Sequence, residues 1–562
     1  MSVAGIAQAL LLIGLVVAIT PVLGAYMARV FTGQRTFAAP VLLPLERGLL
    51  RLLGVRADAQ QDWKGYARSL LIFSALSWIA LYVLLRLQTA KGGGAPPDAS
   101  FNTVTSFVTN TNWQFYGGET TMSNVSQAVG LAVQNFVSAG VGLAVAIALI
   151  RAIAARSATT IGSFFVDLVR GIVHVLLPLS VLLALVFASQ GVVQTLGTVG
   201  PGGAAVGPVA SQEAIKLLGT NGGGFFNVNS AHPFENPDAL TNLLQLLAIL
   251  AIPAALTSTF GRMVGSRRQG WALFSAMLAM FAVGVVIVYA AEAHGTPAQQ
   301  LAGLAGGNLE GKETRFGVAG SSLYAVVTTV ASCGAVNAAM ESLTGLGATV
   351  PLANMMTGEV IFGGVGSGLY GMLLFVLLAV FLAGLMVGRT PEYLGKKLEA
   401  REIKLVAIGT LAVPLLVLVA TAVSVSSRYG DPSVFNAGPQ GFTETLYAYT
   451  SQANNNGSAF AGFTGFVQPN GSNDGAFGIT FADLTGGLAM LLGRFGPMIA
   501  VLAIAGTLAR KGVAPASTGT FRTDTGTFVV LLIGAVALVA LLTFVPALLL
   551  GPVVQGLTDQ LF

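Results

Sequence analysis

Four short polar peptides recur along this 562-residue sequence, each directly behind a moderately apolar stretch. The apolar stretches are residues 101–108, 213–218, 321–331 and 442–453. The polar peptides begin TNTNWQ at 109, GTNGGGFF at 219, SCGAVN at 332 and NNNGSAF at 454. Placing Thr111, Gly222, Gly334 and Gly457 in register gives spacings of 111, 112 and 123 residues, a near-constant period that indicates internal duplication.

Backbone carbonyl groups are the chemistry that these peptides offer. Rings of carbonyl oxygens replace the hydration shell of a potassium ion, and glycine permits the backbone angles that turn carbonyls toward one axis. The peptides contain no carboxylate, whereas acidic rings are typical of divalent-cation filters. A short helix before each peptide would point its partly negative C-terminal end at the same place.

These features predict a selectivity filter for a monovalent cation. One such loop alone would be a glycine-rich surface turn more often than a filter, but four in register favour the filter. The candidate filter residues are Asn110, Thr111, Asn112, Gln114, Thr220, Asn221, Gly222, Gly223, Ser332, Cys333, Gly334, Asn455, Asn456 and Gly457.

Composition places these loops in a membrane protein. Charged residues make up 9% of the chain and apolar residues 54%, which excludes a soluble protein of this length. Non-helical backbone at membrane depth is tolerated only inside protein or along a water-filled path. Ten apolar segments are long enough to span as helices: 3–28, 69–85, 128–150, 172–188, 240–260, 271–291, 360–387, 405–425, 484–508 and 528–550.

The predicted fold is therefore an all-α polytopic membrane protein with ten transmembrane helices. Four membrane–pore–membrane repeats surround a central pore, and one extra helix is left at each end. The predicted divisions are a first helix with a basic cytoplasmic loop at 1–65, pore repeats at 66–156, 157–268, 269–402 and 403–511, and a last helix at 512–562.

The basic residues predict the orientation. The connections after spans one, three, five, seven and nine hold 20 of the 28 lysines and arginines, so these connections are expected in the cytoplasm and both termini outside. The net charge of +5 is thereby explained without a nucleic-acid partner. The basic loop at 29–68 is read as a topology signal, with contact to anionic membrane lipid as the alternative.

Catalytic and transition-metal chemistry find little support. The sequence has one cysteine, three histidines far apart and no Walker-type motif, so no catalytic site, no cofactor and no transition metal are expected in this chain.

The four peptides, together with AHPFENP (231–237), RTPEYLGKK (389–397) and GRFGPMIA (493–500), resemble the potassium-translocating A subunit (KdpA) family of the bacterial Kdp potassium-transporting P-type ATPase. That family belongs to the superfamily of potassium transporters. The resemblance implies a non-catalytic subunit of a high-affinity uptake pump in the bacterial inner membrane. Such a subunit selects extracytoplasmic K⁺ and passes it to the catalytic P-type subunit (KdpB), alongside a C subunit (KdpC) and a small F peptide (KdpF).

Three further residues are candidates for an inner ion path. Arg494 lies inside span nine, where a charge is costly and usually faces protein or water. Span seven is expected to open with Glu359 and is interrupted by a glycine-rich stretch that contains Ser367. The alternatives are a structural ion pair for Arg494, an interfacial carboxylate at Glu359 and glycines that serve packing.

Two other functions remain open from the residues. A stand-alone or ATP-gated potassium channel of the same superfamily would use eight spans rather than ten. A sodium-coupled solute carrier would show two inverted halves with broken helices, whereas four loops of one period point away from it.

Overall fold

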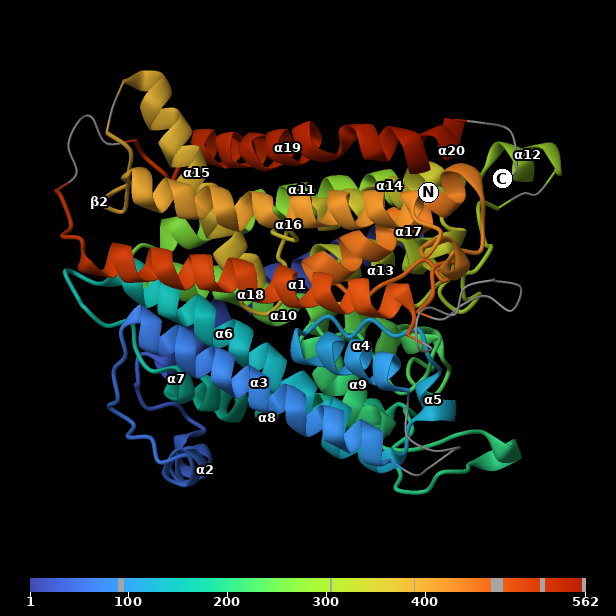
Figure 1. Cartoon of the computed structure of the whole chain (residues 1–562), viewed down its shortest axis with the longest axis horizontal. Coiled ribbons are helices and arrows are strands. Elements are labelled where there is room, and N and C mark those ends of the chain that lie inside the picture. The colour runs from blue at the N-terminus through green and yellow to red at the C-terminus, as the bar shows by residue number, and fades with distance from the viewer. Residues whose placement is uncertain (89–95, 304–305, 389, 466–478, 516–520, 558–562) are drawn as a thin grey trace.

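The computed structural model describes residues 1–88, 96–303, 306–388, 390–465, 479–515 and 521–557 (Figure 1). The described part contains ten helical segments long and apolar enough to cross a membrane. They are α1 (Val3–Phe31), α3 (Trp63–Leu87), η1 with α6 (Ser126–Ala154), α7 to α8 (Phe164–Ser189), α10 (Ala239–Met263), α11 (Arg267–His294), α15 (Ser367–Val387), α16 (Ala400–Ser426), α18 (Phe481–Arg510) and α19 (Gly526–Leu548). Each overlaps one predicted span, so the all-α polytopic fold is confirmed.

Four shorter helices precede the four polar loops, as predicted. They are α4 (Pro97–Val108), α9 (Val209–Leu218), α13 (Gly317–Val330) and α17 (Gly438–Asn454). Each lies in chain order between two spanning segments; α4, α9 and α17 pack on both of theirs, whereas α13 packs on α11 and α14. Some of these helices also contact a spanning helix outside their own pair: α4 contacts α18, and α9 contacts α6.

The second spanning helix of each pair forms the inside of the molecule. In α6, α10, α15 and α18, 61–83% of the apolar core segment is buried, against 22–50% in the first helices α3, α7–α8, α11 and α16. The two extra helices lie outside this arrangement, because α1 packs along α10 and α19 packs on α11 and α15.

The two ends of the bundle differ. The amphipathic helix α2 (Ala39–Leu52) and the two-stranded hairpin of β1 (Glu392–Tyr393) and β2 (Lys396–Lys397) lie at one end (Figure 1, left). The N-terminus, α5 (Gly118–Thr121) and α12 (Pro297–Leu301) lie at the opposite end, toward which α4 and α17 are also displaced.

The seventh span begins later than predicted. The expected segment 360–387 includes seven residues that are not helical, and α15 starts only at Ser367. Gly363 and Gly366 adopt φ angles of 69° and 90°, which a helix does not contain. A Cβ atom at Gly366 would collide with the backbone carbonyl of Gly142 on α6. Glu359 therefore lies in a break between α15 and the unpredicted helix α14 (Gly345–Met356), not at the start of a helix.

Close packing of α1 on α10 gives a stability prediction. A Cβ atom at Gly24 would lie 2.5 Å from Ser258 Cβ and 2.6 Å from the Ala255 carbonyl oxygen. Gly24→Val should therefore destabilise the chain by about 1–3 kcal/mol through overpacking, read as a lower melting temperature of the purified protein. Gly14→Val is the matched control, because Gly14 lies on the same helix with no such atom within 4 Å. Equal melting temperatures for the two variants would contradict the tight α1–α10 contact.

Candidate ion-binding site

The four loops leave their helices with one shared backbone pattern. In each loop two residues with positive φ flank one residue without it. The pairs are Asn110 (68°) and Asn112 (53°), Thr220 (49°) and Gly222 (92°), Ser332 (51°) and Gly334 (79°), and Asn455 (62°) and Gly457 (104°). Glycine and asparagine tolerate the left-handed region best. The alternation lets successive carbonyl oxygens point to the same side of the chain.

The hydrogen bonds at the helix ends fix the register of the loops. Backbone N–H groups of Asn221 and Gly222 donate to the Lys216 carbonyl at 2.7 and 3.1 Å. In the first loop the N–H groups of Thr111 and Asn112 donate to the Ser106 carbonyl at 2.8 and 3.0 Å. In the third loop Cys333 N–H donates to the Thr328 carbonyl at 3.1 Å, and in the fourth Asn456 N–H donates to the Ser451 carbonyl at 2.8 Å. By this pattern Asn112, not Thr111, is equivalent to the three glycines. The predicted register of the first loop was wrong by one residue.

The loops meet in a closed arrangement, here called the four-loop ring (residues 109–114, 219–224, 332–337 and 454–459). A Cβ atom on each of its register glycines would strike a carbonyl oxygen of the next loop: Gly222 that of Cys333, Gly334 that of Asn456, and Gly457 that of Thr111. The first and second loops also approach closely, but one residue further along: a Cβ at Gly223 would lie 2.7 Å from the Asn112 carbonyl oxygen. At three of the four junctions a backbone carbonyl therefore approaches a register glycine so closely that no side chain would fit there.

Side chains of the ring tie neighbouring loops together. Asn110 Nδ2 donates to the Thr220 carbonyl at 2.9 Å, and Ser332 Oγ donates to the Asn455 carbonyl at 2.9 Å. Asn455 Nδ2 donates to Thr111 Oγ1 at 2.9 Å. Gln114 Oε1 accepts the Gly224 N–H at 3.0 Å across the first two loops. Hydrogen bonds between neighbouring loops therefore hold the four-loop ring in one geometry.

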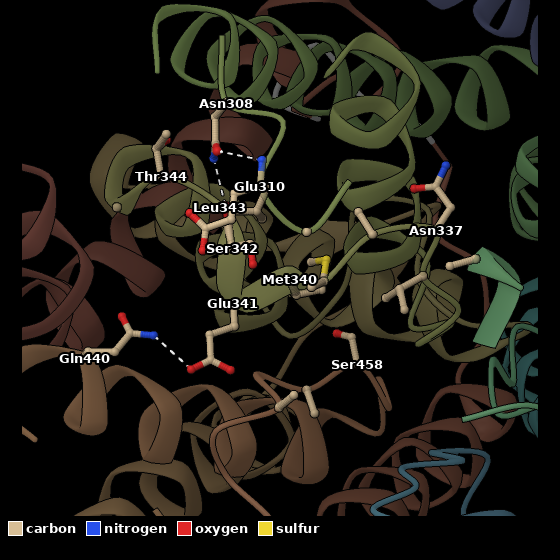
Figure 2. Close-up of a pocket in the computed structure, with 18 of the residues that line it drawn as sticks. Asn308, Glu310, Asn337, Met340, Glu341, Ser342, Leu343, Thr344, Gln440 and Ser458 are labelled. Atoms are coloured by element: carbon tan, nitrogen blue, oxygen red, sulfur yellow. Dashed lines mark hydrogen bonds between the residues drawn. The ribbon is translucent and has the colours of Figure 1, made fainter. Parts of the chain in front are cut away.

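A large cavity opens above the ring, here called the vestibule. Its volume is about 1220 Å³, and the ring residues Asn112, Gly334 and Gly457 belong to its wall. Figure 2 shows other lining residues, including Asn337, Glu341, Gln440 and Ser458. Among the described residues that line it are three glutamates (Glu310, Glu313 and Glu341) and no lysine or arginine. Glu313 is paired with Arg315 at 3.2 Å, so Glu310 and Glu341 give the vestibule its negative charge, which favours cations.

Glu341, which lines the vestibule, contacts the buried carboxyl group of Glu444. Asn436 Nδ2 donates to Glu341 Oε1 at 3.1 Å and to Glu444 Oε1 at 2.5 Å. Glu341 also accepts the Gly462 N–H at 2.6 Å and the Gln440 amide at 3.3 Å. Burial and contact with the Glu341 carboxyl raise the pKa of Glu444 to about 7. Glu444 therefore keeps its proton up to about neutral pH.

The raised pKa of Glu444 predicts a pH-dependent stability. The folded chain keeps this proton to about pH 7, whereas an unfolded glutamate loses it near about pH 4.3. The contribution to stability therefore falls as the pH rises through this window and is level above it. Glu444→Gln keeps an acceptor for Asn436, so its melting temperature should rise relative to the unsubstituted chain from pH 5 to pH 7. A constant difference across this range would contradict the raised pKa of Glu444.

A smaller cavity adjoins the ring on the side where the loops begin. It has a volume of about 80 Å³, and Glu359, Ser367, Arg494 and Asn455 are among its lining residues. Glu359 is 3% exposed, and its Oε1 accepts from Asn456 Nδ2 at 2.7 Å. Arg494 is 4% exposed, and its Nη2 contacts the Ser138 carbonyl at 3.5 Å. The structure thus brings together all three residues predicted for an inner path.

The structure places the predicted site residues as follows. All fourteen candidate filter residues lie on the four loops, and the vestibule and small cavity flank these loops. Sequence reasoning missed Glu341 and Glu444, which come together only through tertiary contacts. It also missed the buried charges beside the second loop, although Glu235 lies in the motif AHPFENP that carried the resemblance.

The ten helices and the four-loop ring define a multi-pass pore-loop membrane protein. Residues 10–557 match the family described as potassium-transporting ATPase A subunit. The chain is 56% identical over 559 residues to the potassium-transporting ATPase potassium-binding subunit of Granulibacter bethesdensis, which covers 97% of this chain and 96% of that protein. A protein of the same description from Methylobacterium nodulans is 54% identical over 571 residues, 99% of this chain and 98% of that protein. The chain belongs to the family of potassium-transporting ATPase A subunits.

Proposed function

We propose that this chain is the non-catalytic, potassium-selecting subunit of an ATP-driven high-affinity potassium uptake pump, with the four-loop ring as its selectivity filter. The observation that supports this proposal is the close approach of a carbonyl oxygen to a glycine at each junction of the four loops, at Gly222, Gly334, Gly457 and Gly223. Carbonyl rings of this kind replace the hydration shell of potassium. The names of the relatives, potassium-binding subunits, support the same ion.

The proposed path runs through three spaces. A hydrated cation enters the vestibule, where Glu310 and Glu341 attract it. It loses its water at the ring and then reaches the small cavity lined by Glu359, Ser367 and Arg494. From there the ion passes toward the catalytic subunit.

The proposed partners and location are those that the resemblance to the A subunit family of the Kdp ATPase implies. The partners are the catalytic P-type subunit KdpB, the C subunit KdpC and the F peptide KdpF, in a bacterial inner membrane. The end of the bundle with α2 and the β-hairpin faces the cytoplasm, because basic residues gather in its connections. Both termini are then extracytoplasmic, and the repeats divide at 66–156, 157–268, 269–402 and 403–511.

Ion-stimulated ATP hydrolysis by the complex tests the proposal. The chain is co-purified with its ATPase partner, and activity is titrated with potassium and then with sodium. Stimulation by potassium at far lower concentration than by sodium supports the proposed function. Equal stimulation by both ions contradicts it, potassium conduction by the purified chain alone indicates a channel, and sodium-driven uptake of an organic solute indicates a carrier.

A further inference from the structure

One position in the four loops differs in kind from its equivalents. The carbonyls of Ser106, Lys216, Thr328 and Ser451 accept the N–H groups that open the ring loops, so these residues occupy equivalent positions. Three of the four carry a hydroxyl group. Ser106 Oγ donates to the Trp113 carbonyl at 3.0 Å, and Ser451 Oγ accepts the Gly457 N–H at 3.0 Å. In two loops, therefore, this side chain holds the backbone of its own loop.

Lys216 occupies the same position in the second loop and is completely buried. Its Nζ lies 2.6 Å from Glu213 Oε2, 2.8 Å from Asn229 Oδ1 and 3.4 Å from Glu235 Oε2. The Glu213 and Glu235 side chains are 0% and 1% exposed. Burying three ionisable groups is costly and persists only with close pairing and hydrogen bonds.

This charged cluster holds the second loop directly. Glu235 Oε1 accepts the backbone N–H groups of Phe225 and Phe226 at 3.2 and 3.4 Å. A Cβ atom at Gly224 would collide with Lys216 Nζ and lie 3.0 Å from Glu235 Oε1. The loop therefore passes over the ammonium and carboxyl groups with no space for a side chain between them.

The same cluster is also hydrogen-bonded, through Gln245, to the helix that precedes the third loop. Gln245 Nε2 donates to the Glu235 carbonyl at 3.0 Å, and Tyr324 on α13 donates to Gln245 Oε1 at 3.0 Å. Because α13 leads into the third loop, the cluster links the backbone of the second loop to the helix that positions the next one.

We propose that Lys216 and Glu235 form a clamp that sets the shape of the second ring loop and thereby determines ion discrimination. This inference rests on the proposed function of the ring. Both are positioning residues, since they act through the backbone of residues 221–226 and do not themselves line the vestibule or the small cavity.

Two uncharged variants of Glu235 isolate the effect of its hydrogen bonds to the loop backbone. Burial raises the pKa of Glu235 to about 8, so glutamine resembles its form at pH 7. Both Glu235→Gln and Glu235→Met leave Lys216 paired with Glu213, but only glutamine keeps an acceptor for Phe225 and Phe226. Glu235→Gln should retain the ratio of half-stimulating ammonium and potassium concentrations in the ATPase complex. Glu235→Met should lower this ratio about tenfold, the equivalent of one strong hydrogen bond.

A second pair of variants keeps the test decisive if Glu235→Met does not assemble. The double variant Glu213→Gln with Lys216→Met removes the ion pair at similar volume and should lower the ratio in the same way. Its matched control is Glu292→Gln with Lys312→Met, which removes an equally buried ion pair of 2.8 Å that bonds Asn308 and Thr344 instead of ring backbone. The control should change melting temperature without changing the ratio.

Discrimination and stability are read on the same preparations. The proposal is overturned if the Lys216 and Glu235 variants keep the ratio of the control, or if Glu235→Gln loses as much as Glu235→Met. A direct ring variant, Gly222→Asp, is measured in parallel. If Gly222→Asp changes the ratio of half-stimulating ammonium and potassium concentrations but the Lys216 and Glu235 variants do not, only the clamp is rejected. If Gly222→Asp leaves this ratio unchanged, the filter and the clamp are both rejected.

Discussion

Gly222→Asp is expected to raise the potassium concentration that half-stimulates ATP hydrolysis by about a hundredfold or more, roughly 2.7 kcal/mol. The new Cβ would collide with the Cys333 carbonyl oxygen of the next loop. The φ of 92° at this position adds strain, since non-glycine residues rarely adopt it. The carboxylate would also supply a charged ligand that binds sodium and hydrated cations without the carbonyl ring. Discrimination between potassium and sodium should fall with affinity.

A substitution at a second glycine, Gly265, controls for the effect of backbone strain without disturbing the four-loop ring. Gly265 has a φ of 77°, lies after α10 and has no atom within 4 Å of a built Cβ outside its own neighbours. Gly265→Asp should leave potassium affinity and discrimination unchanged. If Gly222→Asp assembles normally and behaves like Gly265→Asp, the ring is not the filter.

Arg494 and Glu359 should give opposite effects in the small cavity beside the ring. Arg494→Met removes a buried positive charge from the cavity that Glu359 also lines, so a cation there is held more tightly and released more slowly. The maximal rate of potassium-stimulated ATP hydrolysis should fall about tenfold, without an increase in the half-stimulating concentration. Glu359→Gln keeps the acceptor for Asn456 but removes a carboxyl group that can ionise beside a cation, while Arg494 still repels it, so the half-stimulating concentration should rise about tenfold.

Arg262 supplies the matched control for Arg494. Its Nη2 contacts a backbone carbonyl, that of Pro21, at 3.3 Å, much as Arg494 contacts Ser138 at 3.5 Å, but it does not line the cavity with Glu359. Arg262→Met should leave maximal rate and half-stimulating concentration near those of the unsubstituted complex. If Arg494→Met and Glu359→Gln both raise the half-stimulating potassium concentration, the two residues only stabilise the fold.

The sequence predicted the spans and the four loops because both depend on local signals. Apolar length identifies a spanning helix, and a repeated polar, glycine-rich peptide identifies a pore loop. The one-residue error in the first loop has a physical cause. Register was assigned from spacing, whereas it is set by the N–H groups that return to the carbonyl of Ser106. Asn112 then adopts the left-handed conformation that glycine supplies in the other loops.

The remaining differences come from contacts between distant segments. Hydropathy included 360–366 in the seventh span, but Gly366 leaves the helix to approach the Gly142 backbone on α6. Glu341 and Glu444 are 103 positions apart and meet through Asn436, and Lys216 gains its role from Glu235 beyond the loop. No local pattern encodes these pairings, although an isolated lysine inside a predicted pore helix was a usable signal.

The position of a bound ion is the most direct test of the four-loop ring. Rubidium, a close substitute for potassium, can be located by its anomalous scattering in crystals of the chain assembled with its ATPase partner. Rubidium should lie without a water shell between the carbonyl oxygens of Thr111, Asn221, Cys333 and Asn456. Rubidium bound only among the carboxylates of the vestibule, with the four-loop ring empty at saturating concentration, would contradict the filter.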